Sequence, residues 1–330
     1  MRPFAFDHAD SVGGAIDAAE AGAKYYAGGT NLLDLMKSGV ESPSALVDIR
    51  RLELDSITTT DDSAVLIGAG ATNSAVANHP LIRTRYPVLS QAILSGATTQ
   101  IRNMATIGGN LVQRTRCPYF MDPSFAHCNK RSPATGCAAR DGVNREHALF
   151  GASESCVAVH PSDMAVALVM LDATVQVQGP QGRRRIPMGE FLVLPGLTPD
   201  RDNALRPAEL ITGVVLPRSS FARHSWYLKV RDRHSYAFAL VSVAAGVHLH
   251  DGIISSAAIS AGGVAAKPWR VTAAEDALTG RSPDTETFRA AARLFTADAV
   301  PLSQNGFKVD LVMHSVVRAL ERAVDHALAQ

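Results

Sequence analysis

The sequence predicts an α+β protein built in two parts, and three observations support this prediction. The chain has 330 residues, which is too many for one small domain and enough for a substantial core. Segments with the patterns of strands and of helices both occur along it. Pro, Arg and Ser interrupt the apolar pattern at 216–220, which indicates a domain boundary. Beyond that point Asp251-Gly252 joins two apolar runs, a strong hairpin signal. We therefore expect a larger part over 1–220 and a smaller part over 221–330.

The composition is that of an ordinary globular protein, with 46% hydrophobic and 19% charged residues. The formal net charge is only +1, so nothing indicates a nucleic-acid partner or a membrane surface. No apolar run is long enough to span a bilayer. The first residues lack an apolar segment and a twin-arginine pair, and we therefore expect no export signal in this chain.

The larger part is expected to begin with a strand and an Ala-rich helix over 4–22, with Ser11 as the N-cap. Residues 24–37 then indicate a strand, a glycine turn and a helix, an order that presents backbone N–H groups at a helix N-terminus. The other elements expected here are strands at 45–57, 63–71, 156–160 and 174–178, and helices near 72, at 88–96 and at 164–171. In the smaller part we expect strands at 226–231, 237–249 and 253–261, followed by helices at 272–279, 285–297 and 307–328.

Two glycine pairs are candidates for binding an anionic group. Gly108 and Gly109 can adopt φ > 0 and let phosphate or ribityl oxygens approach the peptide N–H groups closely. Gly28 and Gly29 precede an expected helix, although a pair of this kind is often plain turn chemistry. A third glycine-rich segment does not match the dinucleotide-binding pattern, because Asn73 stands where the third glycine is required.

All four cysteines lie in one long segment of low apolar periodicity. They are Cys117, Cys128, Cys137 and Cys156, separated by ten, eight and eighteen residues. A structureless loop of this length is unusual unless something binds in it. Structural zinc sites use closely spaced Cys pairs, which are missing here, whereas widely spaced thiolates suit an iron–sulfur centre. We therefore place an iron–sulfur centre ahead of zinc, with two disulfides third.

Three segments together resemble the FAD-binding medium subunit of the xanthine dehydrogenase and carbon monoxide dehydrogenase family. They are Ala27-Gly28-Gly29-Thr30-Asn31-Leu32, Ala105-Thr106-Ile107-Gly108-Gly109-Asn110-Leu111 and His160-Pro161-Ser162-Asp163-Met164-Ala165. The similarity spans nearly the whole chain. The four cysteines, with Gln113-Arg114-Thr115-Arg116-Cys117-Pro118, further resemble a branch of bacterial periplasmic aldehyde oxidoreductases whose FAD subunit carries an additional [4Fe–4S] cluster.

The resemblance implies the fold and the flavin-binding residues. The expected fold is a two-part FAD-binding domain of the vanillyl-alcohol-oxidase type, with sub-domains of about 1–55 and 56–220. A smaller α+β domain with a three-stranded antiparallel sheet then covers 221–330. Asp163 would hold polar groups of the ribityl or adenosine portion, or be merely a helix N-cap, and Lys229 would lie near the isoalloxazine. Residues implied to cradle the FAD diphosphate are Lys24, Tyr25, Tyr26, Ala27, Gly28, Gly29, Thr30, Asn31, Leu32, Thr106, Gly109 and Asn110.

The resemblance also implies a function without a catalytic residue in this chain. A molybdenum-cofactor large subunit would oxidise an aldehyde, a [2Fe–2S] small subunit would relay the electrons, and FAD here would pass them to an acceptor. Cys117, Cys128, Cys137 and Cys156 would bind the [4Fe–4S] cluster. The alternatives are a stand-alone flavin oxidoreductase with a structural zinc or inert cysteines, and a cofactor-free scaffold. Both the cytoplasm and the periplasm, reached with a signal-bearing partner, remain open as compartments.

Overall fold

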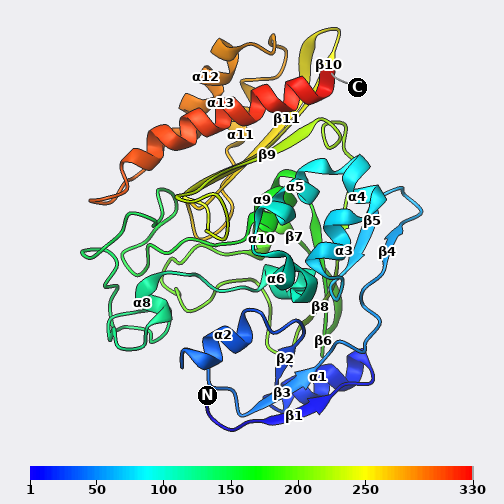
Figure 1. Cartoon of the computed structure of the whole chain (residues 1–330), viewed down its shortest axis with the longest axis vertical. Helices are drawn as coiled ribbons and strands as arrows, with labels where there is room; N and C mark the ends of the chain where they lie inside the picture. The colour runs from blue at the N-terminus through cyan, green and yellow to red at the C-terminus, as the bar shows by residue number, and fades with distance from the viewer. Residues whose placement is uncertain (329–330) are drawn as a thin grey trace.

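Three β-sheets follow one another along the long axis of the molecule (Figure 1). The computed structural model describes residues 1–328. The first sheet, near the N-terminus, is parallel and has the order β1 (Ala5–His8), β3 (Ala45–Asp48), β2 (Lys24–Tyr26). Parallel neighbours need crossover connections, and α1 (Val12–Glu20) and α2 (Leu32–Lys37) provide them. Ser11 caps α1 as predicted, because its Oγ accepts a hydrogen bond from Gly14 N at 3.0 Å.

The second sheet is antiparallel and contains five strands in the order β4-β5-β8-β6-β7. β8 enters between β5 and β6 from a distant part of the chain, so the sheet is completed only after the cysteine segment has been passed. The strands are β4 (Ile57–Thr59), β5 (Val65–Gly68), β6 (Thr174–Gly179), β7 (Gly182–Pro187) and β8 (Leu210–Leu216). The helices of this region are α3 (Asn73–Asn78), α4 (Pro80–Arg85), α5 (Pro87–Ser95), α6 (Thr99–Met104), α7 (Ile107–Leu111), α9 (Asp163–Met170) and α10 (Met188–Phe191).

The third sheet confirms the three-stranded antiparallel sheet expected in the smaller part. Its order is β11 (Ile253–Gly262), β10 (Val241–His250), β9 (Ser225–Val230), and the hairpin turns at Asp251-Gly252. The helices α11 (Thr272–Asp276), α12 (Thr285–Thr296) and α13 (Phe307–Leu328) follow, and α13 lies along β9 and β10. Val312, Val316 and Leu320 on the predicted apolar stripe of α13 are fully buried against this sheet.

Helices α5 and α9 pack between the second and third sheets and join them into one body. All eight residues of α9 are buried, and the helix contacts both β10 and β11. Helix α5 contacts α9 and β9. A helix that is apolar on every side is stable only in such a fully covered position. This arrangement places the first residue of α9, Asp163, close to the strand β9.

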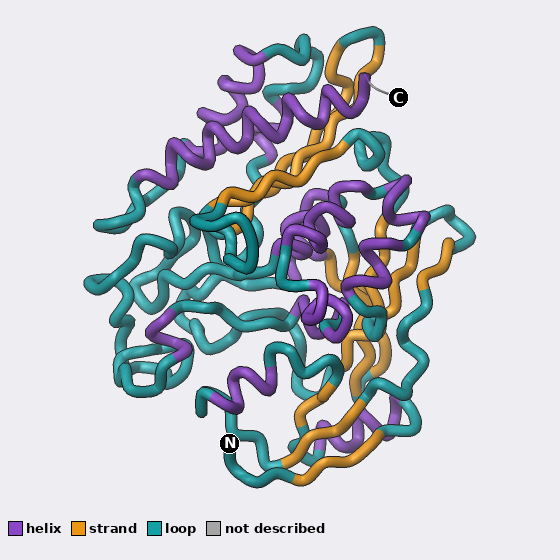
Figure 2. The backbone as a smooth tube through the Cα atoms, viewed as in Figure 1, coloured by secondary structure: helices purple, strands orange, loops and turns teal. Residues whose placement is uncertain are grey.

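The chain from 112 to 162 is almost entirely loop and runs beside the sheets (Figure 2). Its helical turn is α8 (Pro118–Met121). The strand expected at 156–160 is wrong, because Cys156 forms only an isolated bridge with Ser153. The loop is nevertheless fixed, since Phe150 stacks on Trp269 with ring centroids 5.2 Å apart.

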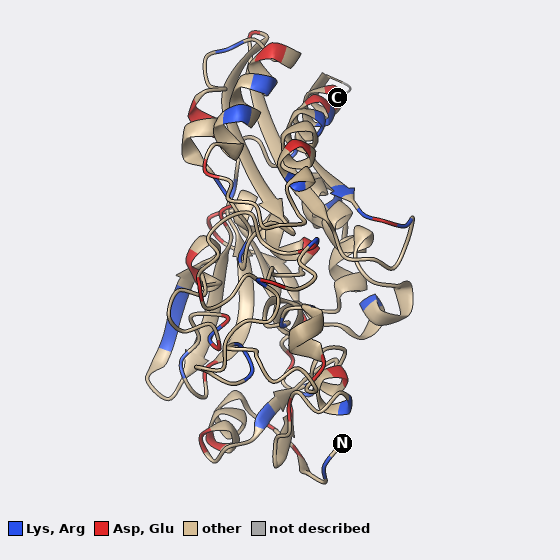
Figure 3. Cartoon of the chain, turned by 90° about the vertical axis from the view of Figure 1, so that its left-hand side faces the viewer, with Lys and Arg blue, Asp and Glu red and all other residues tan. Residues whose placement is uncertain are grey.

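Charged residues of both signs are spread along the length of the molecule (Figure 3). Within residues 1–328, no helix combines the length and apolar character needed to cross a membrane.

Candidate functional site

A cleft formed by two adjoining cavities lies mainly in residues 1–220 and reaches β9 of the smaller part. One cavity, of about 480 Å³, is lined by the segment that follows β2 and by the residues around α7. The other, of about 550 Å³, extends from α7 to α9 and β9. Both cavities are lined by Thr30, Asn31 and Gly109, so these residues mark the point where they meet. An elongated two-lobed cleft suits a ligand with two large ends and a narrow middle.

The segment between β2 and α2 presents free hydrogen-bond donors at this meeting point. Among residues 1–328, no backbone or side-chain acceptor takes a hydrogen bond from the backbone N–H of Gly28, Gly29 or Thr30. Gly29 has φ = 70°, which favours glycine. A Cβ on Gly28 would lie 1.9 Å from the carbonyl oxygen of Met104, so the two chain segments approach too closely for any side chain there. Consecutive free N–H groups in such a turn form an anion-binding concavity.

Gly108 and Gly109 serve a different purpose from the one expected. Both lie in the helix α7, and neither has a positive φ. A Cβ on Gly108 would stand 3.2 Å from the Cβ of Ala69, so this glycine lets α7 pack closely against the end of β5. Thr106 caps the helix, because its Oγ1 accepts from Gly109 N at 3.2 Å. The close approach of backbones, rather than a left-handed turn, explains this glycine pair.

Most of the residues implied to bind FAD line the cleft. Tyr26 is the exception, because its ring packs on Phe6 at 5.5 Å between centroids and lies under the guanidinium of Arg50. Lys24 reaches the cleft, but its ammonium forms an ion pair with Glu41. The residues that line the first cavity are Lys24, Tyr25, Ala27, Gly28, Gly29, Thr30, Asn31, Leu32, Thr106 and Gly109, and those that line the second are Thr30, Asn31, Gly109, Asn110, Asp163 and Lys229.

Asn31 has a side-chain donor without a partner at the centre of the cleft. Its Oδ1 accepts from Arg114 N at 3.2 Å, whereas its Nδ2 is buried with no hydrogen-bond partner among residues 1–328. A buried donor that lacks a partner costs free energy, so such a group in a cavity wall indicates a missing acceptor.

Asp163 and Lys229 line the second cavity, and the buried Tyr227 hydrogen-bonds to this pair. Lys229 Nζ lies 2.8 Å from Asp163 Oδ2, and Tyr227 Oη donates to Asp163 Oδ1 at 2.6 Å. Asp163 is also the first residue of α9, whose N-cap is Ser162. The interpretation of Asp163 as the helix N-cap is therefore wrong, and its carboxylate is instead held by two side chains of β9. Burial and the neighbouring Asp163 raise the pKa of Tyr227 well above its ordinary value, so Tyr227 is a hydrogen-bond donor at neutral pH.

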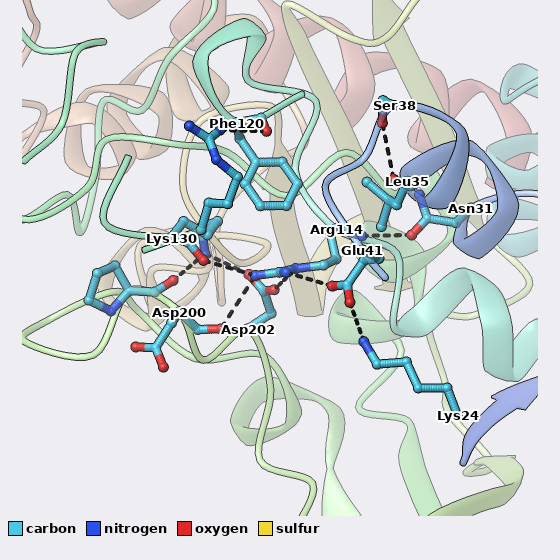
Figure 4. A network of polar contacts seen from close by, with 12 residues as sticks. Lys24, Asn31, Leu35, Ser38, Glu41, Arg114, Phe120, Lys130, Asp200 and Asp202 are labelled. Carbon is cyan, nitrogen blue, oxygen red and sulfur yellow. Dashed lines mark hydrogen bonds and ion pairs between the residues drawn. The ribbon is translucent and has the colours of Figure 1, made fainter. Parts of the chain in front are cut away.

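Arg114 connects the first cavity to the cysteine segment through a network of ion pairs (Figure 4). Its Nη1 lies 2.9 Å from Glu41 Oε1, and its Nε lies 2.7 Å from Asp202 Oδ2. Lys130 donates to Asp202 Oδ1 at 2.6 Å. Burial by itself would raise the pKa of Asp202, but the charges of Lys130 and Arg114 outweigh it and hold this pKa below its ordinary value. Both carboxylates of the network are therefore ionised at neutral pH.

The four cysteines are brought together around one small cavity. All four thiols are free, and Cys128 faces Cys137 across an isolated antiparallel bridge. Burial raises the pKa of Cys117 to about 11. A hydrogen bond from Cys156 lowers the pKa of Cys137 to about 6 and raises that of Cys156. In the described residues, no group of three or more His, Cys, Asp or Glu side chains is arranged to hold a metal ion.

Sequence reasoning missed two contributors to these sites, Tyr227 and Asp202. Tyr227 could have been found, because it stands two residues before Lys229 on an expected strand and therefore on the same face. His147 lies among the cysteines in the sequence and could have replaced a thiolate ligand, and in the structure its Nε2 lies 3.2 Å from Cys117 Sγ. Burial lowers the pKa of His147 to about 4, so the ring is neutral at pH 7. Asp202 lies 88 residues from Arg114, and only the folded chain pairs them.

Comparisons with known proteins identify the family of this chain. Residues 2–219 match the family described as the FAD binding domain in molybdopterin dehydrogenase, and residues 226–326 match the CO dehydrogenase flavoprotein C-terminal domain. The chain is 46% identical to the aldehyde oxidoreductase FAD-binding subunit PaoB of Escherichia coli K12, over 98% of this chain and 99% of that protein. It is 27% identical to the nicotinate dehydrogenase FAD-subunit of Eubacterium barkeri, over 80% and 74% of the two chains.

A solved structure has the same fold over the full length. The carbon monoxide dehydrogenase of Hydrogenophaga pseudoflava superposes with a TM-score of 0.76 at 25% identity, over 98% of each chain. The two matched domains together span nearly the whole sequence. The chain therefore belongs to the family of FAD-binding medium subunits of xanthine dehydrogenase and carbon monoxide dehydrogenase type, and it is an oxidoreductase subunit.

Proposed function

We propose that this chain is the electron-transferring FAD subunit of a molybdenum-containing aldehyde oxidoreductase. The observation that carries the proposal is the 46% identity to the E. coli aldehyde oxidoreductase subunit over essentially the whole of both chains. The chain also offers the cleft that a flavin dinucleotide requires. Bound FAD would supply reversible two-electron chemistry, and the protein supplies binding, orientation and charge around it.

The free N–H groups of Gly28, Gly29 and Thr30 are the donors that we assign to the FAD diphosphate. Gly28 and Gly29 line the first cavity and Thr30 lines both, so a diphosphate beside these donors leaves one cavity for each end of the dinucleotide. The unpartnered Nδ2 of Asn31 supplies a further donor. Gly109 also lines both cavities, Thr106 lines the first and Asn110 the second, while Lys24, Tyr25, Ala27 and Leu32 shape the first cavity.

We assign Asp163 and Lys229 to the flavin end of the cleft as a pair rather than as two separate contacts. The ion pair between them neutralises most of the charge of the lysine, which is buried beside the cavity. Lys229 also donates to Ser95 O at 3.2 Å, so one N–H of its ammonium remains, and through this donor, more than as a free cation, Lys229 would stabilise negative charge on the reduced flavin. The hydrogen bond from Tyr227 holds the carboxylate of Asp163 in place, and this carboxylate in turn positions the ammonium of Lys229.

We further propose that Cys117, Cys128, Cys137 and Cys156 hold a [4Fe–4S] cluster. The four free thiols around one cavity support this, since a bound cluster would take one thiolate ligand from each of the four cysteines. Among residues 1–328 the side chains are not arranged to hold a single metal ion, and Cys156 lies close enough to Cys137 to hydrogen-bond with it, so the proposal rests on the four thiols that share one cavity.

The proposed assembly is a heterotrimer with a molybdenum-cofactor large subunit and a [2Fe–2S] small subunit. This chain contributes its FAD-binding part, placed at 1–220 with sub-domains near 1–55 and 56–220, and a C-terminal domain at 221–330. Such a complex can act in the cytoplasm or, exported with a signal-bearing partner, in the periplasm. Cell fractionation with an antibody to this chain distinguishes the two.

The test follows the flavin absorbance under anaerobic conditions after an aldehyde is added. We expect bleaching in the purified heterotrimer and none in the isolated FAD-loaded chain, because the aldehyde is oxidised by the partner. Bleaching of the isolated chain at the same rate would favour the stand-alone flavin oxidoreductase instead. A purified chain that takes up no flavin would leave only the scaffold alternative.

A further inference from the structure

A fourth cavity, of about 200 Å³, lies between the flavin end of the cleft and the cysteine cavity. It shares Pro161, Ser162 and Asp163 with the cleft. It shares Thr115 and Cys117 with the cysteine cavity. Of the four cysteines, Cys117 alone lines both this fourth cavity and the cysteine cavity within residues 1–328. Cys117 is therefore the thiol that faces the flavin end of the cleft.

Cys117 is also the thiol that contacts a histidine side chain. The Nε2 atom of His147 lies 3.2 Å from Cys117 Sγ, which is hydrogen-bond distance for a sulfur acceptor. The contact at Cys156 is of another kind, since there the backbone N–H of Ala158 donates to the sulfur at 3.5 Å. His147 is 4% exposed, so the contact lies in a largely buried setting, where a hydrogen bond is electrostatically stronger than in water.

The position of His147 is set by the C-terminal domain. Its backbone carbonyl accepts from Lys308 Nζ at 2.9 Å and from Asn305 Nδ2 at 3.1 Å. Lys308 and Asn305 are both fully buried, and Lys308 also donates to Gly263 O at 2.6 Å. The start of α13 thus holds the residue that contacts Cys117, although α13 itself lines neither the cleft nor the cysteine cavity.

We propose that His147 is a positioning residue that donates Nε2–H to the Cys117 sulfur and thereby raises the reduction potential of the cluster held there. The inference rests on the proposed [4Fe–4S] site. Reduction adds one electron and increases the negative charge on the ligand sulfurs, so a fixed donor stabilises the reduced state more than the oxidised state. No proton or further reactant enters this one-electron couple.

The experiment is a redox titration of the purified heterotrimer, followed by electron paramagnetic resonance, with iron and flavin content measured on the same samples. His147→Leu removes the donor at similar volume, and His147→Gln keeps an N–H donor on a side chain of similar reach. His250→Leu, at an exposed histidine of the β10–β11 hairpin, is the matched control. The flavin potential in each sample serves as an internal reference.

We expect His147→Leu to shift the cluster potential downward, so that the ratio of reduced to oxidised cluster at a fixed potential falls by up to tenfold, about 59 mV for one electron. His147→Gln should recover most of the shift, and His250→Leu should show none. If His147→Leu loses the iron of the [4Fe–4S] cluster while His147→Gln retains it, the result equally supports an N–H donor at this position.

Three results would overturn the inference, and they are distinguishable from one another. An unchanged [4Fe–4S] potential in wild type, His147→Leu and His147→Gln, with the iron content of the complex unchanged, removes the role of His147 and leaves the cluster proposal intact. A wild-type complex that contains only the iron of its [2Fe–2S] small subunit, with no [4Fe–4S] signal, removes the cluster proposal itself. Loss of about four irons and of the [4Fe–4S] signal in both histidine variants assigns His147 a structural role instead.

Discussion

The ammonium of Lys229 lies 2.8 Å from the carboxylate of Asp163, and this ion pair joins β9, the first strand of the C-terminal sheet, to the first turn of α9 in the larger part of the chain. Lys229 comes from β9 and Asp163 from α9, and their side chains are only 5% and 8% exposed. The pair forms part of the cleft wall. The flavin end of the site therefore depends on how the two domains pack against each other.

Breaking this pair should destabilise the protein strongly. Lys229→Met leaves Asp163 buried without its cation, and we expect the free energy of unfolding to fall by about 3–5 kcal/mol. Urea unfolding measures the change, and Lys37→Met, at the exposed end of α2, should stay within about 0.5 kcal/mol of wild type. The double variant Lys229→Met/Asp163→Asn should lose less than the sum of the single variants. Additive losses would show that the two residues do not interact.

Gly29→Val should abolish tight flavin binding. Valine disfavours the observed φ of 70°, and its Cβ would stand 2.8 Å from Tyr26 Cε2, so the turn that presents the N–H groups must rearrange. We expect the Kd for FAD to rise at least tenfold, about 1.4 kcal/mol, in a fluorescence titration of the flavin-free chain. Gly13→Ala lies in α1, where a Cβ meets nothing closer than 3.9 Å, and should bind FAD normally. Unchanged affinity in Gly29→Val would rule out the assigned cradle.

Arg114→Lys should weaken the link between the cleft and the cysteine loop. The guanidinium bonds Glu41 and Asp202 at once and lies 4.6 Å from the Phe120 ring centroid, and an ammonium cannot make all three contacts. We expect a loss of about 2–3 kcal/mol in the free energy of unfolding. Hydrogen exchange should also quicken at Lys130 and its neighbours. Arg183→Lys on the exposed strand β7 is the control, and equal effects of the two changes would contradict the network.

The same network should make the protein sensitive to acid. The folded-state pKa of Asp202 lies below its ordinary 3.8, so the unfolded chain takes up this proton at a higher pH than the folded chain. The unfolded state then binds more protons, and the free energy of unfolding falls as the pH drops below about 4. Asp202→Asn should be less stable at pH 7 yet show a shallower slope in acid. An unchanged slope in urea titrations at several pH values would exclude Asp202 as the cause.

The sequence was most informative where periodicity is long and local. Helix α13 spans Phe307–Leu328, the range its apolar stripe predicts, and the Asp251-Gly252 hairpin forms in place. The glycine segments and cysteines also pointed to the cleft and to the thiol cavity, because the residues themselves restrict what each segment can do.

What the sequence could not provide depends on packing between distant segments. Cys156-Val157-Ala158 is as apolar as a strand, yet it runs as a buried loop, since a short apolar run does not separate the two. Gly108 lies in a helix and packs against Ala69, a neighbour that only the fold brings close. The contact of His147 with Cys117 likewise requires the C-terminal domain to be in place.

The most direct test of the proposed two-cofactor subunit is the iron and FAD content of the anaerobically purified chain, in wild type and in Cys128→Ser. We expect one FAD and about four irons in wild type, and FAD without iron in Cys128→Ser, because the cleft residues other than Glu146 lie outside 117–156. Ser124→Ala, in the same loop, should retain both cofactors. FAD with one zinc, or FAD with no metal, in the wild-type chain would contradict the cluster and reduce the four cysteines to a structural role.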